Sequence, residues 1–198
     1  MGEEGTVGFY DVPLDELRIA TSWRFQESDS PFNFSRVVLT GSRVTVEENV
    51  VLNAGSLAVE GASVELRDNA VLTIPLISLT NSTLTVTGKE TVNASDVSLV
   101  GSTITDVAGG VISLNVPRLA VDASSVITAD GKGYGPMGGP GAPLNDCVGA
   151  SHGGRGGGGG PEVYGSAAEP VDFGSGSGSA GGGAIRLVVT DTLTVNGA

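Results

Sequence analysis

The chain has 198 residues, enough for one substantial domain, and hydrophobic residues make up 39% of it while aromatic residues make up only 5%. Its core must therefore be built from Val, Leu and Ile. The formal net charge of −12 argues against binding to nucleic acid or to an anionic membrane, because both attract clustered Lys and Arg. A single cysteine, Cys147, excludes an intramolecular disulfide framework. No apolar run reaches the length of about 18 residues that a transmembrane helix needs, so no membrane insertion is expected.

A period of about twenty residues organises most of the chain. The segments VVLTGSRV (37–44), LAVEGASV (57–64), ISLTNSTL (77–84), VSLVGSTI (97–104) and LAVDASSV (119–126) match one another. Apolar and polar residues alternate within each unit, which is the period of a β-strand. One unit cannot bury its apolar row alone, but stacked rows bury one another. The pattern predicts an all-β fold, a parallel β-helix (β-solenoid) with about 20 residues per rung. An ordinary β-sandwich would not keep so strict a period.

Residues 1–36 are predicted to form an N-terminal cap and a first rung. Leu17 and Ile19 lie twenty positions before Val37 and Leu39, so the repeat already begins here. Terminal repeats are atypical because they must cover an open core. We expect the plug over this end to be formed by four aromatic residues, which are Trp23, Phe25, Phe32 and Phe34.

Residues 37–129 are predicted to form the solenoid rungs, with five inward columns of apolar residues. The columns are Val37, Leu57, Ile77, Val97 and Leu119; Leu39, Val59, Leu79, Leu99 and Val121; Val44, Val64, Leu84, Ile104 and Val126; Leu52, Leu72, Val92 and Ile112; and Ala54, Ile74, Ala94 and Leu114. Asp106 stands at a position where Val86 and its equivalents point inward. Either that strand ends early or a local polar bond satisfies the carboxylate.

Residues 130–183 are predicted to form one long glycine-rich loop, inserted at a corner of the solenoid. The 74 positions from Ala123 to Gly197 equal one rung of 20 and an insertion of 54. Runs such as GSGSGSAGGG (174–183) are typical of flexible linkers. The loop, however, also contains Tyr, Pro, Phe, His and Arg residues in no repetitive order. We therefore expect an ordered, compact loop that packs on the flank of the solenoid.

The loop also contains a motif that matches a nucleotide-binding fingerprint by its letters alone. The segment GYGPMG (133–138) has the form G-x-G-x-x-G. That motif requires a strand before it and a helix after it. Pro136 and the glycines that follow exclude a helix, so nucleotide binding is not predicted.

The candidate binding residues all lie in this loop. They are Asp130, Tyr134, His152, Arg155, Glu162, Tyr164 and Asp172. A His near carboxylates can act as a general base or as a metal ligand. A lone His cannot supply the two or three histidines that zinc sites commonly use. The simplest interpretation is that these side chains hydrogen-bond to loop carbonyls. No catalytic residue, metal ligand or cofactor is predicted, and Ca²⁺ is the metal that the available carboxylates would suit best.

Residues 184–198 are predicted to form a rung that continues the solenoid. The segment LTVNGA (193–198) repeats LAVEGA (57–62). A bare solenoid end is an open sheet edge, which native proteins protect. We therefore expect the rest of a longer chain after Ala198.

The glycine-rich loop resembles a known module. The blocks ADGKGYGPMGGPGAP, GASHGGRGGGGG, VYGSAAEPVDFGSGSG and GGGAIRL follow one another from about residue 128 to residue 189. They are similar to the DGKGY, SHGGRGG, YGS, GSGSG and GGGAI blocks of a glycine-rich module in large surface or secreted parallel β-helix proteins of bacteria, protists and plants. The resemblance implies an adhesive or structural role and brings no catalytic residues.

The expected function is that of a non-enzymatic structural or adhesive segment of a larger extracellular or cell-surface β-solenoid protein. Surface glycans or other extracellular proteins would be its partners. Three Asn-x-Ser/Thr triplets suit an extracellular glycoprotein, with candidate N-glycosylation at Asn33, Asn81 and Asn93. The alternative is a carbohydrate-binding or polysaccharide-processing β-helix with a site on the glycine-rich loop. Convergence of the loop's charged residues and His152 on a concave pocket would favour that alternative.

Overall fold

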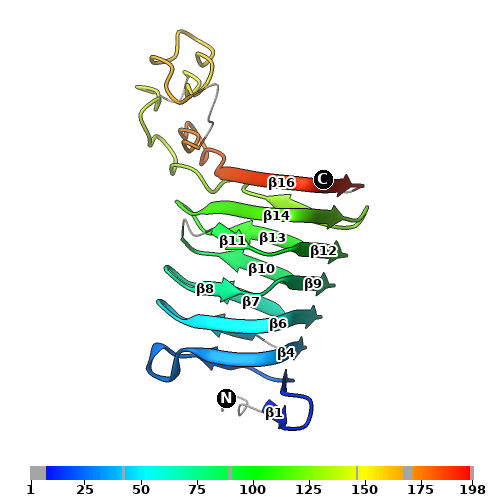
Figure 1. Cartoon of the computed structure of the whole chain (residues 1–198). Coiled ribbons are helices and arrows are strands. Elements are labelled where there is room, and N and C mark those ends of the chain that lie inside the picture. Colours follow the sequence, from blue (N-terminus) through cyan, green and yellow to red (C-terminus); the bar gives the residue numbers. More distant parts are fainter. Residues whose placement is uncertain (1–7, 42, 89–90, 146, 167–170, 197–198) are drawn as a thin grey trace.

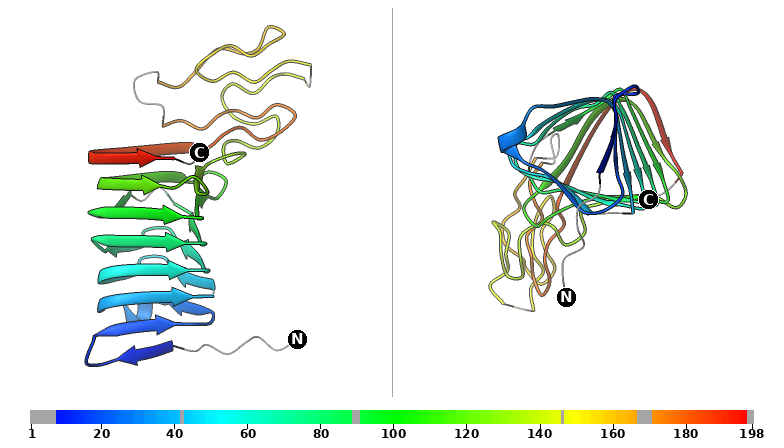
Figure 2. Two further views of the ribbon diagram at one scale, coloured as in Figure 1. Left: turned by 90° about the vertical axis from the view of Figure 1, so that its right-hand side faces the viewer. Right: turned by 90° about the horizontal axis from the view of Figure 1, so that it is seen from below.

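The structure, a computed structural model, describes residues 8–41, 43–88, 91–145, 147–166 and 171–196. These residues form strands and one short 3-10 helix, and none of them is in an α-helix. The strands build a parallel β-solenoid of about six turns, roughly 20 residues apart (Figure 1). The predicted fold class is therefore confirmed. Seen along the stack, the coil has a three-sided outline (Figure 2, right).

The larger sheet forms two sides of the coil, and its longest strands continue around the corner between them. These strands are β4 (Phe32–Thr40), β6 (Val51–Glu60), β14 (Val111–Val121) and β16 (Ala184–Val195). Two intermediate coils interrupt the strand at this corner, giving β8 (Val71–Thr73) and β9 (Leu76–Thr80), and β11 (Thr91–Asn93) and β12 (Asp96–Val100). Each of these strands pairs in parallel with its neighbours in the stack, and β16 pairs with β14.

The smaller sheet forms the third side and contains one short strand from each coil. Its strands are β3 (Trp23–Phe25), β5 (Arg43–Val46), β7 (Ser63–Leu66), β10 (Thr83–Val86), β13 (Thr103–Asp106) and β15 (Val126–Thr128). Neighbouring strands are parallel and in register, so each inward residue stacks on its equivalent in the next coil. The two sheets together enclose one continuous apolar core.

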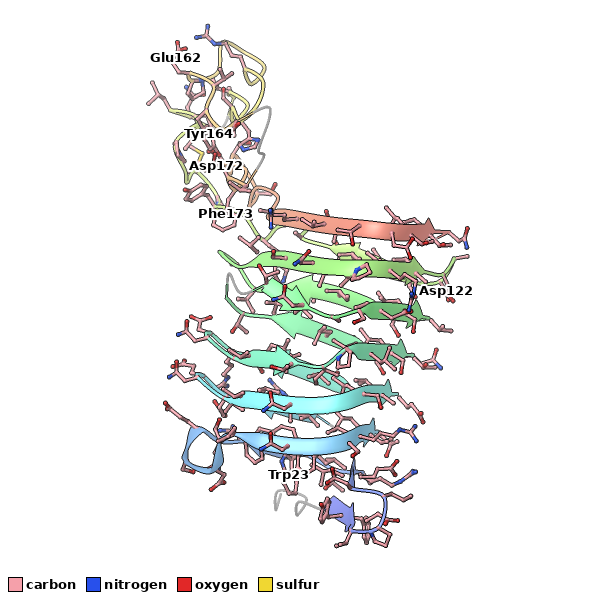
Figure 3. All side chains as sticks on the ribbon, viewed as in Figure 1. Trp23, Asp122, Glu162, Tyr164, Asp172 and Phe173 are labelled. Carbon is pink, nitrogen blue, oxygen red and sulfur yellow. The ribbon has the colours of Figure 1, made fainter. Side chains whose placement is uncertain are left out.

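The N-terminal end of the coil is covered by an antiparallel strand and by aromatic side chains. Strand β1 (Gly8–Asp11) runs antiparallel to β2 (Glu16–Ile19), and a 3-10 turn, η1 (Glu27–Asp29), follows β3. The ring of Phe25 is buried and meets Phe32 edge to face, with ring centroids 5.0 Å apart. The ring of Trp23 lies beside that of Phe25, with centroids 6.2 Å apart, and close to Gly8 of β1 (Figure 3).

The two predicted core columns on the larger sheet are buried along the whole stack. None of their ten residues exposes more than 4% of its surface, and they are Val37, Leu57, Ile77, Val97, Leu119, Leu39, Val59, Leu79, Leu99 and Val121. Each lies directly opposite its equivalent in the neighbouring coil. Like-on-like stacking is therefore the arrangement that removes these side chains from water.

The fourth and fifth predicted columns are wrong in their last coil. Leu114, and not Ile112, lies opposite Val92. The turn that precedes β14 is longer than its equivalent, because eight positions separate Asp106 from Leu114 while six separate Val86 from Val92. The two extra residues shift every partner in β14 by one full strand period, so the side chains keep their inward orientation.

The third predicted column is also wrong in its last coil. Ile127, and not Val126, lies opposite Ile104. Six positions separate Val121 from Ile127, whereas five separate Leu99 from Ile104. A shift of one residue reverses which face a side chain occupies, so Val126 moves out of the inward column.

A ladder of serines satisfies the backbone at the corner between the two sheets. The amide of Ala62 donates to Oγ of Ser82 at 3.2 Å, the amide of Ser82 donates to Oγ of Ser102 at 3.1 Å, and the amide of Ser102 donates to Oγ of Ser125 at 2.9 Å. The ladder ends where Ser125 Oγ donates to Asp122 at 2.5 Å. This hydrogen bond is the main reason why the pKa of Asp122 lies below its ordinary value.

Replacing one residue of the inward column should unfold the solenoid. Leu79 is 1% exposed, and Leu79→Asp places a carboxylate among stacked aliphatic side chains. We expect a loss of about 4 kcal/mol or more in the free energy of unfolding, measured by urea denaturation. Leu76→Asp on the same strand is the matched control, because Leu76 is 49% exposed and should tolerate the change. Equal midpoints for the two variants would contradict the stacking described here.

Candidate functional site in the glycine-rich insertion

The glycine-rich insertion leaves the coil after β15 and returns at β16. It contains no strand in the part that the structure describes, and it lies mostly outside the coil's outline and beyond β16 (Figures 1 and 2). At its base the amide of Gly183 donates to the carbonyl of Ala129 at 2.7 Å. The insertion therefore projects from one corner, and the expectation that it packs along the flank of the solenoid is wrong.

Close contacts between backbones join the beginning of the insertion to its end. The amide of Gly133 donates to the carbonyl of Gly181 and that of Gly174 to the carbonyl of Gly182, both at 2.8 Å, and Tyr134 and Gly181 also pair. A side-chain Cβ on Gly181 would lie 2.0 Å from the carbonyl oxygen of Gly174, and one on Gly133 would lie 2.3 Å from that of Gly182. No residue other than glycine fits here, because backbone atoms occupy the space that a side chain needs.

Three aromatic residues and one serine hold the folded segments of the insertion together. Tyr134 meets Phe173 edge to face, with ring centroids 6.0 Å apart. The hydroxyl of Tyr164 donates to the carbonyl of Phe173 at 2.5 Å and accepts from Ser175 Oγ at 2.7 Å. Ser175 Oγ in turn accepts the amide of Gly141 at 2.9 Å. The bond between Gly141 and Ser175 joins residues that are 34 positions apart in the chain.

The insertion brings an imidazole and a carboxylate to one small space. The ring of His152 lies edge-on to Tyr164, with centroids 4.8 Å apart, and its Nε2 is buried without a hydrogen-bond partner among the described residues. Gly165 has a φ of +85°. A Cβ built on Gly165 would lie 3.1 Å from His152 Nε2 and 3.6 Å from Oδ2 of Asp172. His152, Tyr164 and Asp172 therefore meet at Gly165, and Figure 3 shows Tyr164 and Asp172 close together.

The other predicted binding residues do not join this cluster. Arg155 and Glu162 form an exposed ion pair with an N–O distance of 2.5 Å, at the end of the insertion far from the coil (Figure 3). Such exposed pairs contribute little to stability. Asp130 lies at the base, where its amide donates to Thr128 Oγ1 at 3.3 Å. Tyr134 belongs to the aromatic contact with Phe173. The structure thus brings three of the seven predicted residues together, and the other four lie apart from them.

Two residues that shape the insertion have no charge and were not among the predicted candidates. Ser151 is 1% exposed, and its Oγ donates to the carbonyl of Pro161 at 2.6 Å and accepts the amide of Gly156 at 3.0 Å. Ser175 links Tyr164 to the backbone as described above. Both serines stand inside glycine-rich blocks of the sequence. A small hydroxyl among glycines was the signal that could have pointed to them.

The described part of the insertion offers no metal-binding cluster. No three or more His, Cys, Asp and Glu side chains gather there or elsewhere in the described ranges. Two further carboxylates of the insertion, Asp146 and Glu169, lie outside the described residues.

Asp106 is a buried carboxyl group close to the base of the insertion. Strand β13 extends to Asp106 just as β10 extends to Val86, so the strand does not end early. Neither carboxyl oxygen has a hydrogen-bond partner among the described residues, and the residue has no exposed surface. Both explanations suggested by the sequence are therefore wrong. Burial raises the pKa of Asp106, although the positive charge of Lys132 opposes the shift.

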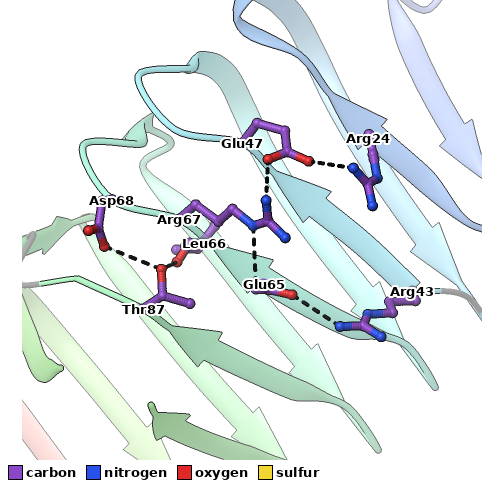
Figure 4. A network of polar contacts seen from close by, with 8 residues as sticks. All are labelled: Arg24, Arg43, Glu47, Glu65, Leu66, Arg67, Asp68 and Thr87. Carbon is purple, nitrogen blue, oxygen red and sulfur yellow. Dashed lines mark hydrogen bonds and ion pairs between the residues drawn. The ribbon is translucent and has the colours of Figure 1, made fainter. Parts of the chain in front are cut away.

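Charged side chains form a network on the outer face of the smaller sheet (Figure 4). Glu47 accepts from Arg24 at 3.1 Å and from Arg67 at 2.6 Å, and Glu65 accepts from Arg67 and from Arg43, both at 3.2 Å. Each carboxylate is thus shared between two guanidinium groups. Neither is free to act as a general acid or base in the way that glycoside hydrolysis requires.

A shallow groove of about 640 Å³ crosses the same face. Its lining includes Ser63, Thr83 and Thr85 as well as Arg43 and Glu65, and none of the described residues that line it is aromatic. Sugar-binding grooves commonly use aromatic faces as platforms. The described lining thus holds one carboxylate, that of Glu65, and no aromatic side chain.

These features define the class of protein to which the chain belongs. It is a parallel β-solenoid with a capped N-terminal end and a folded glycine-rich insertion at one corner. The chain matches no family model, no curated protein and no solved structure. In the described part, none of the elements is a helix long and apolar enough to cross a membrane.

The close contacts in the insertion can be tested with neighbouring glycines. Gly181→Ala should force the backbones apart, whereas a Cβ on Gly182 meets nothing within 4 Å, so Gly182→Ala is the matched control. We expect Gly181→Ala to accelerate hydrogen exchange at the amides of Gly133 and Gly174 about tenfold or more, as overpacking typically costs 1–3 kcal/mol. Exchange is read by NMR. The same rates in both variants would show that the backbones are not in contact.

The buried carboxyl group predicts a dependence of stability on pH. The pKa of Asp106 is higher in the folded chain than in the unfolded chain, where it is about 3.9. Its contribution to stability is therefore greatest at acid pH and declines as the pH rises through the folded pKa. Asp106→Asn mimics the protonated group and should be more stable than the wild type at pH 7, with the difference vanishing near pH 3. Urea unfolding across this range measures it.

A charge-matched control separates burial from net charge. Asp29→Asn removes the same charge from an exposed position in η1 and should leave the pH profile unchanged. Parallel profiles for the wild type and Asp106→Asn would mean that Asp106 is not held protonated in the fold.

Proposed function

We propose that the chain is a non-enzymatic structural or adhesive segment of a larger extracellular or cell-surface β-solenoid protein. The observation that supports this most directly is the regular stack of parallel coils, whose inward positions repeat at β16. Leu193 and Val195 lie opposite Leu119 and Val121, which are 1% and 2% exposed. Strand β16 thus carries the same side-chain alternation as the coils before it.

The distribution of ionisable side chains supports a role without catalysis. The carboxylates on the smaller sheet are shared between arginines, and Arg118 and Asp96 on the larger sheet pair at 2.8 Å. A glycosidase would need two carboxyl groups flanking one substrate-binding cleft. Among the described residues, Asp172 is the carboxylate that faces the single imidazole of the chain, and no second carboxylate is found beside it.

An extracellular location is supported by the candidate glycosylation residues and by the sequence of the insertion. The three candidate glycosylation residues, Asn33, Asn81 and Asn93, are all exposed. Asn33 and Asn93 lie on strands and accept hydrogen bonds from Asn53 at 2.9 Å and Asn115 at 3.0 Å. The resemblance of the insertion to a glycine-rich module of surface proteins points in the same direction.

The cluster at Gly165 favours a second candidate function, glycan binding by the insertion. His152 Nε2 is buried and unpartnered in the described part of the chain, and the carboxylate of Asp172 faces the same space. A sugar hydroxyl donates and accepts hydrogen bonds, so it could satisfy both groups at once. Surface glycans would then be the partners of the rod, and the insertion would be the contact site.

The two functions predict different behaviour towards polysaccharides. Under the leading proposal, the chain releases no reducing ends from a panel of soluble polysaccharides. Retention of those polysaccharides on the immobilised chain should be the same for the wild type and His152→Ala. Turnover that His152→Ala abolishes would overturn the proposal.

Binding without turnover would favour the second candidate. In that case His152→Ala and Asp172→Asn should each weaken retention at least tenfold, as expected when a buried polar contact is lost. Arg155→Ala, at the exposed ion pair away from the cluster, is the control and should retain binding.

A further inference from the structure

The carboxyl group of Asp106 interrupts an apolar column of the smaller sheet, one coil before the base of the insertion. The column below it consists of Val46, Leu66 and Val86, each opposite the next in parallel register. Asp106 has no exposed surface, and neither of its carboxyl oxygens has a hydrogen-bond partner among the described residues. Native folds seldom bury a polar group in this way, so the group calls for an explanation.

The next position of this column is Ala129, which closes the base of the insertion. Strands β13 and β15 are in register, so Ala129, the residue after β15, is the equivalent of Asp106 and is buried in the same core. The carbonyl of Ala129 accepts the amide of Gly183 at 2.7 Å and that of Lys132 at 3.2 Å. These two hydrogen bonds join the beginning of the insertion to its end, one coil above Asp106.

The turn that follows Asp106 lies against both its side chain and the base of the insertion. A Cβ built on Gly110 would lie 3.3 Å from Cβ of Asp106. The neighbouring amide of Gly109 donates to the carbonyl of Lys132 at 2.9 Å. The buried carboxyl group is therefore enclosed by stacked strands below it and by hydrogen-bonded turns above it.

Ionisation of Asp106 acts against this enclosure. A carboxylate in an apolar core needs water or a cation, and burial accordingly raises the pKa of Asp106. Among the described residues, Lys132 is the charged group that acts on the carboxylate, and the two side chains form no ion pair. Lys89 and Glu90 lie outside the described residues. Turns open at a lower cost than stacked strands, so the enclosure gives way at the base of the insertion.

We propose that Asp106 is an acid-operated latch for the insertion. While the carboxyl group is protonated, the hydrogen bonds to Ala129 hold the base closed. Ionisation draws water or the ammonium group of Lys132 to the carboxylate, breaks these hydrogen bonds and frees the insertion to move relative to the coil. The latch closes as the pH falls and opens as the pH rises. It controls how the insertion is presented, and it does not depend on what the insertion contacts or on the proposed function.

Hydrogen exchange at the base tests the latch. Protection of the Lys132 and Gly183 amides, corrected for the intrinsic exchange rate, should fall about tenfold or more between about pH 5 and pH 9 in the wild type. It should stay constant in Asp106→Asn, and also in Asp106→Val, which copies Val86 of the coil below and serves if the amide variant fails to fold. Asp130→Asn removes the same charge from an exposed position at the base and should behave like the wild type.

The single cysteine of the chain provides a second readout. Cys147 is exposed and lies in the insertion, so a pH-insensitive fluorophore on its thiol reports how freely the insertion moves. The anisotropy of the fluorophore should fall as the pH rises in the wild type and stay unchanged in Asp106→Asn. Lys132→Met removes the positive charge that favours the carboxylate, so it should move the transition to higher pH.

Two results would overturn the latch. One is the same loss of protection at the base in Asp106→Asn as in the wild type. The other is an equal loss of protection at the amides of Leu79 and Leu99, because the change would then be unfolding of the whole coil and not an opening of its corner.

Discussion

The fold depends on one constraint, the vertical spacing of parallel strands. Hydrogen bonds hold successive coils about 4.8 Å apart, so equivalent side chains touch only when each coil returns to the same register. A coil of twenty residues meets this condition for Leu39, Val59, Leu79 and Leu99, and the columns that result bury the aliphatic side chains of a chain poor in aromatic residues. Every other feature must leave this register intact.

The corners are where the register can absorb extra residues. Two residues added before β14 and one added after it change the partners but not the stacking. The glycine-rich insertion is the extreme case, since β16 returns to pair with β14 after the excursion from Thr128 to Ala184. The insertion makes backbone contacts within itself and projects from the corner of the coil (Figure 1).

The solenoid buries polar side chains in two different ways. The serines at the sheet corner form a chain of hydrogen bonds that ends on Asp122, so each buried hydroxyl is satisfied. Asp106 has no such partner among the described residues, and burial raises the pKa of its carboxyl group. The ladder of serines repeats from coil to coil and stabilises the solenoid at neutral pH. The second occurs once, beside the base of the insertion, and makes that region sensitive to pH.

The amino-acid sequence by itself determined the class of fold, because alternation and a twenty-residue period are local properties that only a stacked parallel coil satisfies. It also located the insertion and the N-terminal aromatic residues. The register of β14 and β15 against the coil before them was decided by the tertiary structure. Turn length alone does not say whether an extra residue is absorbed before or after a strand, as Leu114 and Ile127 illustrate. The meeting of His152, Tyr164 and Asp172 was likewise a tertiary result. These residues are brought together by glycine backbones that approach within hydrogen-bonding distance, and glycine leaves no side-chain pattern in a sequence from which such contacts could be read.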